Sequence, residues 1–169
     1  MKIIKLMTPL LVSSFLIAPS FATGFQMPFT WGDYGDRSAS VMYMSGSSED
    51  SKILIANITH SASGHQGLYF SDHYVDTSDV CSFKTTVPSR YTMVFNGQAV
   101  KMLRWCKKFT DVDQYYFELT PATERGDNYV IRLFKKATLP IKIQYDNETL
   151  NFPVIGFTKA WNSAGGDAI

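Results

Sequence analysis

The sequence has no marked excess of charge of either sign. It contains 16 Lys and Arg residues against 15 Asp and Glu residues, a formal net charge of +1. Proteins that bind nucleic acids through phosphates usually carry a clear basic excess, so we do not expect a nucleic-acid partner. The one basic run, residues 101–108, is most simply interpreted as a solvated strand end.

Motifs of common active sites are also missing. The sequence contains no Gly-x-Ser-x-Gly element, no His-Glu-x-x-His element and no glycine-rich phosphate loop before a helix. An enzyme whose site is assembled in three dimensions stays open, because such sites are recognised by geometry rather than by spacing. We predict a non-enzymatic protein without an obligatory cofactor.

The chain has only one long apolar run, at its start. Residues 6–18 are almost entirely apolar and follow two lysines, and the triplet Ser20-Phe21-Ala22 has the small residues of a signal-peptidase site. This run is shorter than the roughly 20 residues that span a membrane. We predict a cleavable signal peptide over residues 1–22, no transmembrane segment after cleavage, and one β-rich domain over residues 23–169. The predicted location is the periplasm, with secretion as the alternative.

Cysteine is scarce, since only Cys81 and Cys106 are present. In an oxidising compartment such a pair is expected to form a disulfide. The closed loop would stabilise the fold by about 3 to 3.5 kcal/mol. A redox-active pair usually requires Cys-x-x-Cys spacing, and these cysteines are much farther apart. We therefore predict a structural disulfide.

Alternation with a period of two residues is the main pattern that is present. Its best example surrounds Asn96-Gly97, a dipeptide that provides the positive φ angles of a two-residue hairpin turn. Pairing Phe95 with Gln98 places Met93 opposite Val100 and Tyr91 opposite Met102. The apolar side chains then share one face of the hairpin.

Further strands are indicated at short intervals. They are expected near residues 40–44, 53–59, 68–75, 115–119, 129–133 and 141–145, the last followed by a turn at 146–148 that leads into Leu150 and Phe152. About seven or eight strands with little helix predict an all-β fold, an antiparallel sandwich or barrel with one disulfide. Helix is expected for at most a turn or two, near Thr158–Trp161. The terminal segments 23–29 and 162–169 are expected to be loose.

All three histidines lie in one stretch, at His60, His65 and His73, with Asp72 beside the last. Imidazole and carboxylate groups are typical ligands of zinc or copper, so the stretch is a candidate metal site. A hairpin closed near His60 would place His73 about 20 Å away. Only His60 and His65 could then converge, and the alternative is that both are ordinary loop residues.

Aromatic side chains gather near the two ends of the mature chain. The candidates for binding are Phe29, Trp31, Tyr34 and Trp161. Such residues anchor protein interfaces and stack on sugar rings, and the alternative is that they pack in the core.

The leading hypothesis is an exported binding protein that holds an envelope or extracellular protein through strand edges and these aromatic segments. Carbohydrate or cell-wall binding, and metal binding by the histidines, are the alternatives. The sequence does not fix the oligomeric state.

Overall fold

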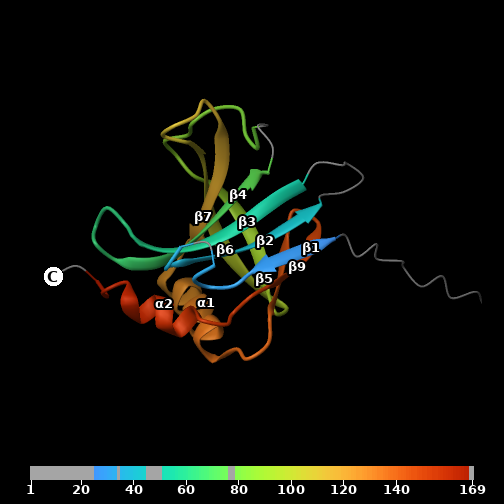
Figure 1. The fold of residues 1–169 in the computed structure, drawn as a ribbon. Helices are drawn as coiled ribbons and strands as arrows, with labels where there is room; N and C mark the ends of the chain where they lie inside the picture. The colour runs from blue at the N-terminus through green and yellow to red at the C-terminus, as the bar shows by residue number, and fades with distance from the viewer. Residues whose placement is uncertain (1–24, 34, 45–50, 76–78, 168–169) are drawn as a thin grey trace, which may run out of the picture.

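The computed structural model describes residues 25–33, 35–44, 51–75 and 79–167, so the predicted signal peptide and Tyr34 lie outside the described residues. Nine antiparallel strands form one nearly closed, barrel-like sheet, and two helices cover one of its ends (Figure 1). The all-β prediction is confirmed.

The strand order is β1-β2-β3-β4-β7-β6-β5-β8-β9. The strands are β1 (Gln26–Phe29), β2 (Ser38–Met44), β3 (Ser51–His60), β4 (Gln66–Tyr74), β5 (Ser89–Phe95), β6 (Gln98–Lys108), β7 (Tyr115–Pro121), β8 (Ile141–Tyr145) and β9 (Glu148–Phe152).

The β5–β6 hairpin has the register that its sequence predicts. Phe95 pairs with Gln98, and Tyr91 pairs with Met102. Asn96 and Gly97 both adopt positive φ, as the tight turn requires. The alternating apolar side chains of this hairpin point into the barrel and join its buried core.

The first and last strands of the sheet meet at a seam. No backbone ladder joins β1 to β9, but the side-chain amide of Gln26 bridges them. Its Nε2 donates to the backbone oxygen of Thr149 at 2.6 Å, and its Oε1 accepts from the backbone N–H of Asn151 at 3.0 Å. The free edges of β1 and β9 therefore face each other. Exposed strand edges can pair with another chain, and this arrangement disfavours such pairing.

The prediction of a strand over residues 129–133 is wrong, because this segment lies in helix α1 (Glu124–Lys136). Thr123 caps the helix, and its side chain accepts a hydrogen bond from the backbone N–H of Gly126. Val130 and Phe134, four residues apart, face the core. The alternation of Tyr129, Ile131 and Leu133 is typical of a strand. The buried residues Val130 and Phe134 instead have the four-residue spacing of a helix face, and this spacing agrees with the structure.

Helices α1 and α2 (Phe157–Ser163) close one end of the barrel, which we call the helix end. Trp31 packs edge-on against Phe157 and Phe134, with ring centroids 4.9 Å and 6.2 Å apart. Gly156 lies beside Trp31 at φ +89°, and a Cβ there would stand only 2.9 Å from the Trp31 backbone oxygen. Glycine therefore permits the approach of α2 to this corner.

The described parts of the terminal segments are ordered, contrary to the expectation of loose tails. Residues 26–29 form β1, and the residues after α2 return to β4. There the backbone N–H of Gly166 donates to Oε1 of Gln66 at 2.7 Å, and Oδ1 of Asp167 accepts from the Gln66 backbone N–H at 2.7 Å. Gln66 is buried, so these bonds satisfy polar groups that water does not reach.

Candidate functional site

The three histidines do not converge. His60 pairs with Gln66 at one end of the β3–β4 hairpin, whereas His73 pairs with Ile53 near the other end. His60 Nε2 lies 2.6 Å from the backbone oxygen of Gly166. Within the described ranges, no group of three or more His, Cys, Asp or Glu side chains is arranged to hold a metal ion.

His65 lies between two carboxylates. Its Nε2 is 3.4 Å from Asp127 of α1, and its Nδ1 is 3.1 Å from Asp167 of the C-terminal segment. The hydrogen bond to Asp127, together with that to Asp167, raises the pKa of His65 above its usual value. The imidazole thus ties the C-terminal segment to α1.

The aromatic candidates take different positions. Trp31 is buried, its Nε1 donates to the Pro153 backbone oxygen at 3.1 Å, and its side chain is not available to a partner. Trp161 and Phe29 are half-buried, and Lys135 stands 4.9 Å above the Trp161 ring. For Trp31, core packing is the role that the structure shows.

A polar layer lies inside the barrel at the end opposite the helices, which we call the loop end. Asp72 is 1% exposed, and its two carboxylate oxygens accept hydrogen bonds from the hydroxyls of Tyr43 at 3.1 Å and Tyr145 at 2.8 Å. Lys52, also buried, pairs with Asp146 at 3.1 Å. Neither sequence motif nor spacing indicates this layer, because its members come from β2, β3, β4 and β8.

Burial dominates the electrostatics of this layer. It raises the pKa of Asp72, an effect that Lys52 and the two tyrosine hydroxyls partly offset. Burial also raises the pKa values of Tyr43 and Tyr145, and the neighbouring Asp72 raises them further. Each Asp72 oxygen accepts a hydrogen bond from a tyrosine hydroxyl, so the arrangement braces the strands that carry these three residues.

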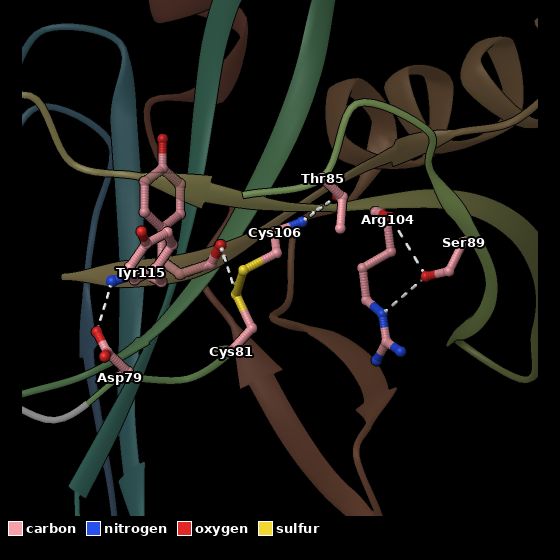
Figure 2. Close-up of a disulfide and its surroundings, with 8 residues drawn as sticks. Asp79, Cys81, Thr85, Ser89, Arg104, Cys106 and Tyr115 are labelled. Atoms are coloured by element: carbon pink, nitrogen blue, oxygen red, sulfur yellow. Dashed lines mark hydrogen bonds between the residues drawn. A yellow bond between two sulfur atoms is a disulfide. The ribbon is translucent and has the colours of Figure 1, made fainter. Parts of the chain in front are cut away.

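Arg104 of β6 lies beside two aromatic rings. Its guanidinium lies 4.6 Å from the ring centroid of Tyr91 and 4.3 Å from that of Phe117. Its Nε donates to Ser89 Oγ at 3.4 Å, as Figure 2 shows. Two aromatic faces therefore hold this cation in place.

Outside the layer, the segment that follows β4 is fastened to β6 and β7. The predicted disulfide between Cys81 and Cys106 is present, and Asp79 Oδ1 accepts from the Tyr115 backbone N–H at 2.7 Å (Figure 2). Thr85 donates its backbone N–H to the Cys106 oxygen at 2.9 Å and accepts from the Cys106 N–H at 3.0 Å. We call residues 79–88 the disulfide loop.

Exposed apolar side chains are concentrated at the loop end. Among the described residues, eight large hydrophobic side chains are exposed, and only Leu139 and Ile155 belong to the helix end. Phe83 and Val87 in the disulfide loop are 66% and 76% exposed. Phe25, Val75, Phe83, Val87 and Val112 lie in segments that flank strands at the loop end, and Met27 lies within β1; we call these exposed side chains together the loop-end surface.

Sequence reasoning did not single out this surface. The sequence signal that could have indicated it is the presence of two apolar residues, Phe83 and Val87, in the loop that contains Cys81.

Comparison of the chain with protein-family models, with curated proteins and with solved structures finds no match. In the described part of the chain, no helix is long and apolar enough to cross a membrane.

Proposed function

We propose that this chain is an exported, non-enzymatic binding protein that holds a protein partner through the loop-end surface. The observation that carries the proposal is the display of Phe83 and Val87, two strongly exposed apolar side chains, on a loop fixed by a disulfide. Export is supported by the predicted signal peptide and by the disulfide, which persists in oxidising compartments. The periplasm is the proposed location, with secretion as the alternative.

The energetics favour a protein partner at this surface. Burying apolar surface releases roughly 25 cal/mol per Å², and a central apolar cluster surrounded by polar groups is typical of interface hot spots. The disulfide loop is already ordered, so binding loses little additional conformational entropy.

Charged pairs border the surface on the β6–β7 side. Lys108 contacts Asp113 at 2.7 Å, and Lys107 contacts Glu118 at 3.5 Å. Lys108 and Asp113 are exposed and Lys107 and Glu118 are half-buried, and such charged groups suit the polar rim that accompanies apolar interface centres.

The route of attachment differs from the one that the sequence suggested. Pairing through the edges of the sheet is disfavoured, because β1 and β9 face each other across the seam that Gln26 bridges. The buried position of Trp31 likewise removes it from the interface.

The test is photo-crosslinking of the oxidised protein in its native compartment, with the crosslinker at residue 83. One dominant protein product is expected, and Val87→Ser should strongly reduce it. The matched control places the crosslinker at residue 139, since Leu139 is 75% exposed but lies at the helix end. The same products from both positions, or none from residue 83, would contradict the proposal.

A further inference from the structure

A run of cations follows the outside of the barrel beside α1. Three adjoining hollows lie there: one at β5 and β6, one between β6 and α1, and one along α1. Lys101 is shared by the first two and Arg132 by the last two. We call their cationic lining the basic track, which consists of Arg90, Lys101, Arg125, Arg132, Lys135 and Lys136.

The central hollow has a volume of about 550 Å³, within the usual range of ligand pockets. Lys101 of β6 lines it from one side, and Arg125 and Arg132 of α1 line it from the other. The two elements approach closely at Gly126, where a Cβ would lie 3.2 Å from Val100 Cγ1. This close approach brings cations of the strand and the helix to one cavity.

Acidic groups are absent from the track. No carboxylate lines any of the three hollows, and within the described ranges none of the six cations forms a salt bridge. Asp127, on α1 itself, is engaged with His65 instead. Because the whole chain is nearly neutral, such segregation creates a local positive potential that attracts anions.

We propose that the basic track binds an acidic polysaccharide. Guanidinium groups form bidentate pairs with carboxylate and sulfate groups. The cations are spread over consecutive hollows, which matches the repeated anionic groups along a polysaccharide. Gln98 and Thr123 in the central hollow are neutral hydrogen-bonding groups that suit sugar hydroxyls. This site shares no residue with the loop-end surface and goes beyond the proposed function.

A nucleic acid fits the track less well. Single strands are usually held by exposed aromatic faces on which bases stack. Tyr129, the aromatic residue of the central hollow, is half-buried, and its hydroxyl donates to the Phe95 backbone oxygen at 3.1 Å.

The experiment measures binding of the oxidised mature protein to heparin and to alginate, with uncharged dextran as the negative probe. Arg125→Ala combined with Arg132→Ala should weaken binding by about tenfold or more, since each cation contributes charge-assisted hydrogen bonds. The matched control is Lys84→Ala with Lys159→Ala, which removes the same charge from exposed positions outside the track and should change affinity by less than about twofold.

Several outcomes would overturn the inference. They are no binding of either anionic polymer at physiological salt, equal losses in the two double variants, or equal binding of dextran. Binding to vesicles that contain anionic lipid, without binding to the soluble polymers, would replace the polysaccharide by a membrane surface. The Val87→Ser variant should keep polymer binding, so failure here and failure of the proposed function are distinguishable.

Discussion

Gln26 and Thr149 are 123 residues apart in the chain, yet the Gln26 side-chain amide donates a 2.6 Å hydrogen bond to the Thr149 backbone. The same amide accepts from Asn151. One side chain thus replaces, at the seam, part of the backbone ladder found elsewhere in the sheet.

Gln26→Ala should destabilise the protein by about 1–2 kcal/mol, because two hydrogen bonds across the seam are lost. Urea denaturation measures this, and hydrogen exchange should show faster opening at Asn151. Gln98→Ala is the control, since within the described part of the chain the Gln98 side chain forms one local hydrogen bond, to the adjacent Ala99 backbone oxygen. An equal effect of the two substitutions would show that the bridge contributes nothing specific.

Asp72→Ala should cost about 3–5 kcal/mol, because it leaves the buried hydroxyls of Tyr43 and Tyr145 without their acceptor. Asp72→Asn should cost less, since an amide oxygen still accepts a hydrogen bond. Asp113→Ala, which removes an exposed carboxylate, should change stability little. Unfolding free energies of the three variants check this order, and a small loss for Asp72→Ala would refute the bracing role.

Reduction of the disulfide should lower stability by about 3 to 3.5 kcal/mol, because the Cys81–Cys106 link closes a 25-residue separation in the unfolded chain. Cys81→Ser with Cys106→Ser should give the same loss, and reductant should then have no further effect. Denaturant unfolding with and without reductant measures both. Two free thiols in the denatured, unreduced protein would contradict the bond itself.

Replacement of His65 by Asn should have a pH-dependent effect on stability. The pKa of His65 is raised in the folded state, so its stabilising contribution is fully present below the unfolded-state value of 6.5 and is lost as the pH rises through the higher folded value. The stability difference between wild type and variant should therefore be largest below pH 6.5 and should shrink as the pH rises above that value.

His73→Asn serves as the control substitution, since His73 lies against the Phe109 ring and does not pair with Asp127 or Asp167. A pH-independent difference for His65→Asn would show that the two carboxylates do not stabilise the protonated ring.

Local patterns predicted much of the sheet. The register of β5–β6 follows from Asn96-Gly97 and the alternation around it, and the disulfide follows from the scarcity of cysteine. Helix α1 was missed because Tyr129, Ile131 and Leu133 alternate like a strand. The opposing signals were the Thr123 cap and the i, i+4 spacing of Val130 and Phe134, and packing at the helix end decides between the two patterns.

The sites were less accessible to sequence reasoning. Asp72 meets Tyr145 only because β8 pairs with β5 and the sheet curls, which no local pattern encodes. The basic track likewise depends on the contact of α1 with β6, so its cations are scattered between Arg90 and Lys136 in the sequence. Tryptophan is a residue type common at binding interfaces, but Trp31 is buried under α2.

The seam also orders the events of folding. Hairpins such as β3–β4 and β5–β6 are made of neighbouring segments and lose little loop entropy when they form. The Gln26 side chain can form its hydrogen bonds only after β9 is in place. Synthesis begins at the N-terminus, so β1 lacks these partners until nearly all of the domain has been made. We therefore expect closure of the barrel to be a late step, reached after the local hairpins and set by the arrival of the C-terminal strands.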